Sequence, residues 1–451
     1  MAKEYDLIVI GTGVAASKIA QTCRNAGWQV AVVDRRPYGG TCRLKGCDPK
    51  KLLWGVAETV EQARRFAQDG FAGKDISLSW PNLVRFKRSF LEGAPEAVEE
   101  SFRASGIEAI HGRAHFVDPN KLAIDGHTVR ARHFVIASGS RPASLPIAGA
   151  DHLLTSDDFM ELNELPNPLI FVGGGYISFE FAHVAAQAGC KVMILHGDER
   201  PLAQFDRDLV DRLISKSRRA GIEIRLNSPV EGIEKTEEGV KVWAKSNGTN
   251  HPFAAAGAVH GAGRVPDIDD LDLGAGGIER EGHRIRLNQS LQSISNPAVY
   301  AAGDAAAAGP MLTPVSELDA DVVGENLLKN APQRRPDYNG VPSVVFTIPP
   351  LASVGLTEDQ ARAQHLHFRI AGVDISGWYS ARRVKEDTAA FKILIEEKTN
   401  RILGAHIIGP NADEVINLFA LAMRLGLPSD KLRHLVPAYP SQAANLEYML
   451  G

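Results

Sequence analysis

Apolar and polar residues follow one another at the start of the chain in the order strand, glycine-rich turn, helix, strand. The run YDLIVI predicts a strand over 5–10, and GTGVAA opens a helix that ends near Gly27. A second apolar run over 29–33 predicts another strand, which closes on Asp34. A glycine turn between strand and helix, with an acid after the next strand, is typical of a mononucleotide-binding fold.

The same order recurs about 160 residues later. LIFV predicts a strand over 169–172, GGGYIS opens a helix that ends near Gly189, and a further strand covers 191–195. Two such folds in one chain suggest two dinucleotides, one that stays bound and one that exchanges.

Other patterns predict the elements around these two folds. One or two helices cover 80–105, and a strand covers 129–137. Alternation over 230–246 predicts an antiparallel ribbon that turns at Glu238 and Gly239.

The tail beyond the proline-containing stretch at 333–336 predicts a separate α+β domain. FKILIEEK and RILGAHII form a hairpin with a turn at Asn400, and a helix covers 413–425. With further seams near Pro146 and Pro266, we predict an α/β protein with two Rossmann-like dinucleotide-binding domains and this C-terminal α+β domain. The predicted boundaries are 1–147, 148–265, 266–334 and 335–451.

Composition narrows the classes of partner. The 451 residues suggest about three domains, and 44% of them are hydrophobic. The net charge is −4, the pI is about 6.4, and no basic block occurs, so nucleic acid and an anionic membrane are poor partners. The chain shows no secretory signal and no apolar run long enough to span a bilayer, so we expect a soluble, cytoplasmic protein with a small-molecule substrate.

The two glycine-rich turns have the residues that dinucleotide binding requires. Gly11 allows the tight turn, Gly13 lets the backbone approach a pyrophosphate, and Ala16 allows close contact between helix and strand. Asp34 can hold a ribose hydroxyl. In the second turn, the corresponding residues are Gly173, Gly175 and Ser178.

Cys42 and Cys47 lie just after the first nucleotide-binding pattern, where a redox-active disulfide beside a flavin is one interpretation and two unrelated buried thiols are another. In a regular helix their Cα atoms would lie roughly 8.7 Å apart, too far for an unstrained disulfide. Gly46 and Pro49 make this turn irregular, so a strained and labile bridge can form. We predict that Cys23 and Cys190, in a helix and at a strand, are small core residues.

These motifs and several others resemble the class I pyridine nucleotide-disulfide oxidoreductases, which include glutathione reductases, dihydrolipoamide dehydrogenases and the core of mercuric reductases. The resemblance covers nearly the whole chain. It rests on GGTCRLKGC, GGGYISFE, ASGSRP, GRVP, AAGD, LTPV and VVFTIPPLASVGLTE. It implies an FAD-binding domain with the redox disulfide over 1–147, an NAD(P)-binding domain over 148–265, a segment completing the FAD domain over 266–334, and a homodimerisation domain over 335–451.

The resemblance also implies the roles of individual residues. Cys42 would attack the substrate disulfide, and Cys47 would contact the flavin. Lys50 would lie near the flavin N5 and pair with Glu180, which would lower the cost of burying the ammonium group. Tyr176 would cover the nicotinamide pocket. The other implied FAD-binding residues are Arg35, Gly40, Thr41, Ala114, Gly139, Asp304 and Thr313, and the other implied NAD(P)-binding residues are Ile177 and Gly263; no residue is assigned to a metal.

The choice of nicotinamide cofactor depends on the residue that ends the second strand of the second fold. An acid there would accept the ribose hydroxyls of NAD, and a base would attract the 2′-phosphate of NADP. His196 occupies this position, and Arg200 follows closely. Asp198 and Glu199 are also near and are candidates for a ribose contact, but we expect NADPH over NADH.

The chain departs from its relatives at the substrate side. Glutathione reductases and dihydrolipoamide dehydrogenases carry a His-Pro-Thr motif and a following Glu, but this chain has Tyr439-Pro440-Ser441, and the Glu position falls near Ala444. A tyrosine is a poor base at neutral pH, although its hydroxyl can donate a hydrogen bond. His434, five residues upstream of Tyr439, is a candidate to compensate.

The acceptor is therefore the open question. The residues that grip glutathione would fall at Val14 and Gln21, and the C-terminal cysteine pair of mercuric reductases is missing. We expect a reductase that passes electrons through Cys42 and Cys47 to a small oxidised acceptor, a disulfide other than glutathione. The alternatives are a quinone or metal-ion reductase and a redox-sensing flavoprotein that signals to a protein partner.

Overall fold

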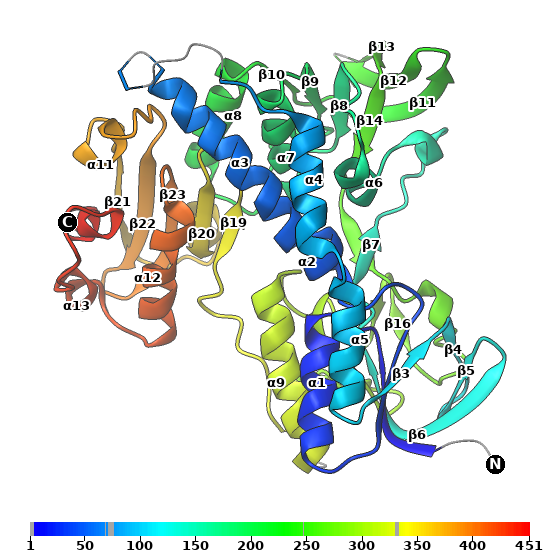
Figure 1. Cartoon of the computed structure of the whole chain (residues 1–451). Coiled ribbons are helices and arrows are strands. Elements are labelled where there is room, and N and C mark those ends of the chain that lie inside the picture. The colour runs from blue at the N-terminus through cyan, green and yellow to red at the C-terminus, as the bar shows by residue number, and fades with distance from the viewer. Residues whose placement is uncertain (1–3, 68, 71–75, 247, 330–332) are drawn as a thin grey trace. The chain divides into compact units, whose positions relative to one another are not determined.

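The computed structural model describes residues 4–67, 69–70, 76–246, 248–329 and 333–451 (Figure 1). The chain divides into two compact units, each built from three segments. The first unit comprises Met1–Lys50, Phe86–Ala143 and Arg264–Tyr338, and the second comprises Lys51–Arg85, Ser144–Gly263 and Asn339–Gly451.

A seven-stranded sheet forms the centre of the first unit. The strands β3, β2, β1 and β6 run parallel in that order, β18 also pairs parallel with β6, and β5 and β4 continue the sheet in antiparallel fashion. The bounds are β1 (Glu4–Ile10), β2 (Val30–Asp34), β3 (Glu108–His111), β4 (Ala114–Asp118), β5 (Lys121–Ile124), β6 (His127–Ile136) and β18 (Val299–Ala301). Two short ribbons accompany it, β7 (Ser140–Pro142) with β15 (Arg264–Pro266) and β16 (Arg280–Glu281) with β17 (Arg284–Ile285).

Helices cover the sheet of the first unit, and α1, α5 and α9 lie beside one another in Figure 1. Side chains of β1 alternate between two buried clusters, Leu7 and Val9 toward α1 and Ile8 and Ile10 toward the other face. Burial on both faces explains why this strand reads as a continuous apolar run. The helices are α1 (Val14–Asn25), α2 (Gly40–Lys45), α5 (Ala94–Ala104) and α9 (Thr313–Lys329), while α3 (Cys47–Arg65) and α4 (Trp80–Leu91) pass from one unit to the other.

The second unit begins with a four-stranded parallel sheet in the order β10, β9, β8, β14. A three-stranded antiparallel meander of β11, β12 and β13 lies in the chain between β10 and β14. The bounds are α6 (Ser156–Glu161), β8 (Leu169–Val172), α7 (Tyr176–Gln187), β9 (Val192–Leu195), α8 (Arg207–Arg219), β10 (Ile222–Arg225), β11 (Val230–Thr236), β12 (Gly239–Ser246), β13 (Thr249–Ala255) and β14 (Gly257–His260).

The C-terminal part of the second unit is a five-stranded sheet in the order β19, β20, β23, β22, β21. Helix α12, which is orange-red in Figure 1, packs on this sheet through Ile416 and Phe419. The bounds are β19 (Ser343–Val345), β20 (Leu351–Gly355), α10 (Glu358–Ala363), β21 (Phe368–Asp374), α11 (Tyr379–Arg382), β22 (Ala390–Glu396), β23 (Ile402–Ile408), α12 (Ala412–Arg424), α13 (Ser429–Arg433) and α14 (Leu446–Met449).

The predicted α/β architecture is confirmed, with small corrections. The segment over 80–105 is two helices, interrupted at Gly93, whose φ of 72° is left-handed. Gly239 was predicted in the turn of the ribbon, but it pairs with Thr236 as the first residue of β12, so the turn consists of Glu237 and Glu238. Cys23 and Cys190 are buried, as predicted for core residues. Among the described residues, no helix is long and apolar enough to cross a bilayer.

Candidate redox and dinucleotide sites

Cys42 and Cys47 lie on either side of a helix break, as the sequence predicted. Helix α2 ends at Lys45, Gly46 has φ −145° and ψ −114°, and α3 begins at Cys47. A Cβ at Gly46 would lie 2.9 Å from the Thr41 carbonyl oxygen, so only glycine lets the chain fold back this closely. The break replaces the regular helical spacing that would keep the two sulfurs apart.

Thr313 connects the two thiols to a distant part of the chain. Its Oγ1, at the start of α9, lies 3.1 Å from Cys42 Sγ and 3.4 Å from Cys47 Sγ. A hydrogen bond from Cys42 lowers the pKa of Cys47 to about 6, and Thr313 and the positive charge of Lys50 act in the same direction against burial. The same bond, together with burial, raises the pKa of Cys42. At neutral pH, Cys47 is therefore the thiolate and Cys42 retains the proton.

We expect this asymmetry to be visible in the pH dependence of alkylation. In the reduced enzyme, Cys47 should react with iodoacetamide half-maximally near its pKa of about 6, faster as pH rises. Thr313→Val removes a hydroxyl that stabilises the thiolate and should move this midpoint upward by about one unit. Thr313→Ser keeps the hydroxyl and serves as the matched control. Equal midpoints in the valine and serine variants would show that the hydroxyl has no part in the shift.

The first glycine turn has the geometry that a pyrophosphate needs. Gly11 has φ +114°, and a Cβ there would lie 2.3 Å from the Ala137 carbonyl oxygen. Gly13 is the N-cap of α1 and offers no side-chain cap, so the N–H groups of the first turn face outward toward a ligand. Ala16 is fully buried where α1 meets the sheet. These features fit the pyrophosphate of FAD.

Asp34 is the last residue of β2, at the position predicted for a ribose contact. Its carboxylate accepts hydrogen bonds from Thr12 Oγ1 at 2.8 Å and from the Arg36 backbone N–H at 3.0 Å. Both oxygens keep further lone pairs, so the carboxylate is oriented for a hydroxyl. Arg35, also predicted to bind the cofactor, forms ion pairs with Asp267 at 2.9 Å and with Asp270. Thr12 was missed by the sequence analysis.

Helix α2, which carries Cys42, touches the first glycine turn. Gly40 opens α2 with φ +70°, and a Cβ there would lie 2.5 Å from Gly13 Cα. Thr41 follows in the same turn and is partly buried. The two glycines therefore allow α2 and the start of α1 to meet backbone to backbone.

Asp304 lies on a short turn that several side chains hold in place. Ser140 Oγ donates to Asp304 Oδ2 at 2.7 Å, and Arg264 donates to Ser140 Oγ at 3.0 Å and to its carbonyl oxygen at 2.8 Å. Two other predicted FAD-binding residues are in this unit, the buried Ala114 at the start of β4 and Gly139 with φ +73°. Ser140 was not predicted, although ASGSRP was recognised as a turn.

Asp319 is a buried carboxylate that fixes the turn before Asp304. It accepts from the Gly303 N–H at 2.9 Å and from the Tyr338 hydroxyl at 2.7 Å. Burial raises the pKa of Asp319 to about 6, against these two hydrogen bonds. Tyr338 also covers the end of the loop, since a Cβ at Gly309 would lie 2.9 Å from its ring.

We expect Asp319→Asn to stabilise the protein above neutral pH. A raised pKa means that the folded state binds more protons than the unfolded state between about pH 4 and pH 6, so stability falls as pH rises through this window. The asparagine Oδ1 can accept the Gly303 N–H while its Nδ2 donates to the Tyr338 hydroxyl oxygen. Because the amide does not ionise, the variant should gain up to about 2 kcal/mol at pH 8 and nothing at pH 4. Melting temperatures across pH check this. Tyr338→Phe, which keeps the carboxylate, should not remove the pH dependence; a parallel pH profile of wild type and Asp319→Asn would contradict the account.

The second glycine turn repeats the geometry of the first. Gly173 has φ +105°, and a Cβ there would lie 2.5 Å from the Gly261 carbonyl oxygen. Gly175 caps α7 without a side-chain hydrogen bond. Tyr176 and Ile177 begin this helix, and the Tyr176 ring packs edge-on against Phe205 at 5.5 Å between centroids. The predicted residue Gly263 has φ +106° and ends the second segment of this unit.

His196 and Arg200 lie beside this turn, and their role in selecting the nicotinamide cofactor stays a prediction. A Cβ at Gly174 would lie 2.7 Å from His196 Cγ, so the imidazole packs on the glycine turn. Its Nε2 lies 3.0 Å from the Arg200 carbonyl oxygen. The Arg200 guanidinium donates to Asp359 at 2.9 Å and to the Phe205 carbonyl oxygen at 2.7 Å.

Glu180 is buried on α7 and accepts the Phe346 N–H at 3.0 Å. One turn further, His183 Nδ1 accepts the Ile348 N–H at 3.2 Å. Burial lowers the pKa of His183 to about 3, so it stays neutral. Lys50 belongs to the first unit and Glu180 to the second, and their pairing stays a prediction.

Tyr439 lies on the C-terminal segment with 84% of its surface exposed. His434 precedes it and is also exposed. Within the part of the chain that the structure describes, no group of three or more His, Cys, Asp or Glu side chains is arranged to hold a metal ion.

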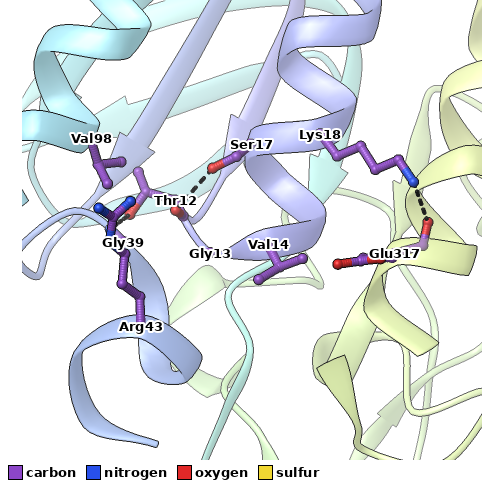
Figure 2. Close-up of a pocket in the computed structure, with 9 residues that line it drawn as sticks. All are labelled: Thr12, Gly13, Val14, Ser17, Lys18, Gly39, Arg43, Val98 and Glu317. Carbon is purple, nitrogen blue, oxygen red and sulfur yellow. Dashed lines mark hydrogen bonds between the residues drawn. The ribbon is translucent and has the colours of Figure 1, made fainter. Parts of the chain in front are cut away.

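A cavity of about 470 Å³ opens in the first unit beside the thiol helix (Figure 2). Its walls come from the start of α1, the β2–α2 connection, α2, α5 and α9. The lining residues are Thr12, Gly13, Val14, Ser17, Lys18, Gly39, Arg43, Val98 and Glu317. Arg43 is the neighbour of Cys42 in the chain, but the lining residues do not include Cys42 or Cys47.

Comparisons with known proteins agree with this arrangement. Residues 5–320 match the family described as pyridine nucleotide-disulphide oxidoreductase, and residues 341–450 match its dimerisation domain. The chain is 30% identical to a glutathione reductase of Burkholderia cepacia, over 93% of each chain. It is 28% identical to a mercuric reductase of Lysinibacillus sphaericus, over 98% of this chain and 81% of the relative. The solved structure of the HOCl-induced flavoprotein disulfide reductase RclA from Escherichia coli aligns with a TM-score of 0.88 and 28% identity, over 99% of each chain. The glycine turns, the thiol pair and these matches together show that the chain belongs to the class I pyridine nucleotide-disulfide oxidoreductases, a family of FAD-dependent enzymes that use NAD(P)H.

Proposed function

We propose that this protein is an NADPH-driven reductase that passes electrons through Cys42 and Cys47 to a small disulfide other than glutathione. The observation that carries the proposal is the thiol pair itself, with Thr313 within 3.5 Å of both sulfurs and the pKa values of the two thiols moved apart. FAD held at the first glycine turn would supply the redox chemistry that links hydride from the nicotinamide to reduction of the Cys42–Cys47 disulfide. The residues around both glycine turns would hold the two dinucleotides.

The thiol chemistry needs only these two cysteines. Cys42 sulfur attacks one sulfur of the acceptor, the acceptor disulfide breaks, and the first product leaves as a thiol after taking a proton. The Cys47 thiolate then attacks Cys42 Sγ and displaces the second product thiol. Cys42 and Cys47 end as a disulfide, oxidised by the two electrons that the acceptor gained.

The proton on Cys42 limits the range of acceptors. Cys42 must lose this proton before it attacks, and Tyr439 occupies the position where relatives carry a histidine. A disulfide whose leaving thiol has a low pKa needs little protonation, so it suits this site best. We infer that Tyr439 serves as a hydrogen-bond donor in place of that histidine.

The C-terminal part supports a homodimer. It matches the dimerisation domain of the family and exposes several large apolar side chains. These are Leu421, Leu425, Leu435, Val436, Tyr439 and Tyr448. Burying these side chains against a second copy would place Tyr439 of each chain at the dimer interface. We expect the dimer in the cytoplasm.

For the nicotinamide cofactor, we propose NADPH. His196 packs on the second glycine turn where an acid would favour NAD, and its Nε2 lies 3.0 Å from the Arg200 carbonyl oxygen. A kcat/KM that is higher for NADPH than for NADH supports this choice, and the reverse order rejects it. His196→Glu should shift the preference toward NADH.

One anaerobic titration tests the proposed function. A stoichiometric amount of NADPH should expose two titratable thiols and produce the long-wavelength absorption of a thiolate beside an oxidised flavin. The band should disappear in Cys47→Ser, because the stabilised thiolate is lost, and persist in Cys190→Ser. If the wild type shows neither the absorption band nor the two titratable thiols, the disulfide mechanism is wrong.

A metal ion is the second candidate acceptor. One relative is a mercuric reductase, and one solved structure of RclA, with a TM-score of 0.88, is described as a Cu(II) complex. NADPH-dependent reduction of Hg(II) or Cu(II), at a rate exceeding that of any disulfide, would favour it. A redox sensor would instead reduce its thiols normally and turn over every small acceptor slowly.

A further inference from the structure

We propose that Gln442 and Asn445 are positioning residues that hold Tyr439 for a hydrogen bond to the leaving sulfur of the acceptor. The inference rests on the proposed function, in which Tyr439 takes the place of a histidine, and it concerns how the chain fixes that tyrosine. Both amides are anchored on Ser380, which belongs neither to the glycine turns nor to the surroundings of the thiol pair.

The segment that carries Tyr439 buries little apolar surface of its own. Residues 433–440 are exposed, apart from the half-buried Pro437. Leu432 before this segment is buried in the core of the C-terminal part, and the next buried residue along the chain is Leu446. Within one copy, apolar burial therefore fixes only the two ends, and polar contacts must decide how the residues between them lie.

Hydrogen bonds within the segment close the turn around Tyr439. Ser441 Oγ donates to the Ala438 carbonyl oxygen at 2.6 Å, and the Ala444 N–H donates to the Ser441 carbonyl oxygen at 3.2 Å. These bonds set the local shape of the turn. Because both partners belong to the same segment, the bonds do not fix the turn relative to the rest of the C-terminal part.

The two amides connect this segment to another element. Gln442 Nε2 donates to the Ser380 carbonyl oxygen at 3.1 Å, and Asn445 Nδ2 donates to Ser380 Oγ at 2.8 Å and to Gln442 Oε1 at 3.1 Å. We call these three residues the amide clamp. Gln442 lies three residues after Tyr439, so the clamp holds the chain directly beside the turn.

Ser380 lies on a well-packed element. It is 7% exposed and belongs to α11, whose N-cap residue is Trp378. The Trp378 ring packs against Phe391 of β22 and against Tyr448 of α14, with ring centroids 6.1 Å and 5.9 Å away. The cavity that adjoins the clamp has about 10 Å³, room for no more than one water molecule. Water therefore has little room to replace the three hydrogen bonds.

A fixed tyrosine matters for some acceptors more than for others. The Tyr439 hydroxyl would donate a hydrogen bond to the sulfur that leaves when Cys42 attacks, and that sulfur then takes its proton from water. An alkyl thiolate is basic and gains from this bond, whereas an aromatic thiolate of low pKa leaves without it. The bond strengthens only as charge develops on the leaving sulfur, so losing it should lower kcat and leave KM unchanged.

Steady-state kinetics of the FAD-loaded enzyme with two acceptors test the clamp. Bis(2-hydroxyethyl) disulfide releases an alkyl thiol, and 5,5′-dithiobis(2-nitrobenzoate) releases an aromatic thiol of low pKa. Gln442→Met and Asn445→Leu keep the side chains close to their original size and remove bonds of the clamp. We expect each to lower kcat for the alkyl disulfide about three- to tenfold at unchanged KM, and to change kcat for the aromatic disulfide less than about twofold.

A double-mutant cycle shows whether the clamp acts through Tyr439. Tyr439→Phe alone should lower kcat for the alkyl disulfide about tenfold. Adding Asn445→Leu to Tyr439→Phe should cause no further loss, because the hydroxyl that the clamp positions is already gone. Losses that multiply in the double variant would mean that the clamp supports the fold rather than the hydroxyl, and would overturn the inference.

Gln292→Met is the matched control. Gln292 Nε2 donates to the Pro297 carbonyl oxygen at 2.8 Å, and its Oε1 accepts from Asn288 at 3.3 Å, so this amide has the same two kinds of partner as Gln442. It lies in the first unit, and its loss should leave kcat for both acceptors unchanged. An equal loss in Gln292→Met and Gln442→Met would contradict a specific role of the clamp.

The outcomes separate this inference from the proposed function. If Tyr439→Phe slows reduction of the alkyl disulfide but the clamp variants do not, the clamp is wrong while Tyr439 keeps its role. If Tyr439→Phe changes nothing, both the role of Tyr439 and the clamp are wrong, while the reductase remains. If NADPH exposes no thiols and neither disulfide is reduced, the proposed function itself fails.

Discussion

Cys42→Ser is expected to lower kcat/KM for every disulfide acceptor by at least about a thousandfold. A serine hydroxyl does not attack disulfides at neutral pH, and no other described thiol can replace Cys42, since Cys23 and Cys190 are buried and Cys47 is the thiolate that must displace the second product. Reduction of the bound flavin by NADPH should continue at its normal rate. Stopped-flow absorbance and steady-state assays measure the two steps separately.

The matched control is Cys190→Ser. Cys190 Sγ donates to the Pro166 carbonyl oxygen at 3.1 Å, and a serine hydroxyl can make the same bond. Its turnover should equal that of the wild type. If a Cys42→Ser enzyme keeps more than about a tenth of the wild-type rate on quinones or metal ions, the alternative of a quinone or metal-ion reductase is favoured.

Gly11→Ala is expected to yield a protein that no longer retains FAD and is destabilised by about 4 kcal/mol. The alanine Cβ would lie 2.3 Å from the Ala137 carbonyl oxygen. Gly11 and Ala137 directly follow the paired parallel strands β1 and β6, so moving the two atoms apart would disturb the pairing of these strands. The positive φ of Gly11 adds strain for an L-residue. The FAD content per chain and the melting temperature report the two effects.

Gly27→Ala separates backbone strain from the clash. Gly27 also has a positive φ, +89°, but no heavy atom lies within 4 Å of the position of its Cβ. We expect a loss of about 1 to 2 kcal/mol and normal FAD content. Equal losses in the two variants would show that the contact with Ala137 does not matter for the turn.

The fold could be predicted from the sequence because its strongest signals are local. Each glycine turn lies between an apolar strand and a helix within about 30 residues, and the hairpin around Asn400 spans a similarly short stretch. The contiguous apolar run of β1 also has a local cause, since both of its faces are buried. The turn before Gly239 was predicted one residue too late, because the register between β11 and β12 determines which two residues form the turn.

The site was predicted less completely because its contacts join distant segments. Thr313 contacts Cys42 across 271 positions, and Ser140 contacts Asp304 across 164, so no spacing rule within one sequence reports them. Thr313 was predicted only through its motif. Asp319 and Tyr338 have no motif, and a buried carboxylate beside the Asp304 turn becomes visible only when the turn is folded.

The contact between Gly13 and Gly40 has a genetic consequence. Because a Cβ at Gly40 would lie 2.5 Å from Gly13 Cα, the segment that would bind phosphate and the segment that carries the thiols share one backbone contact and cannot vary independently. A selection for revertants of a defective Gly40 variant should therefore recover second-site changes in the residues around Gly13. Directed evolution toward a new acceptor, acting on α2, would alter cofactor retention in the same step.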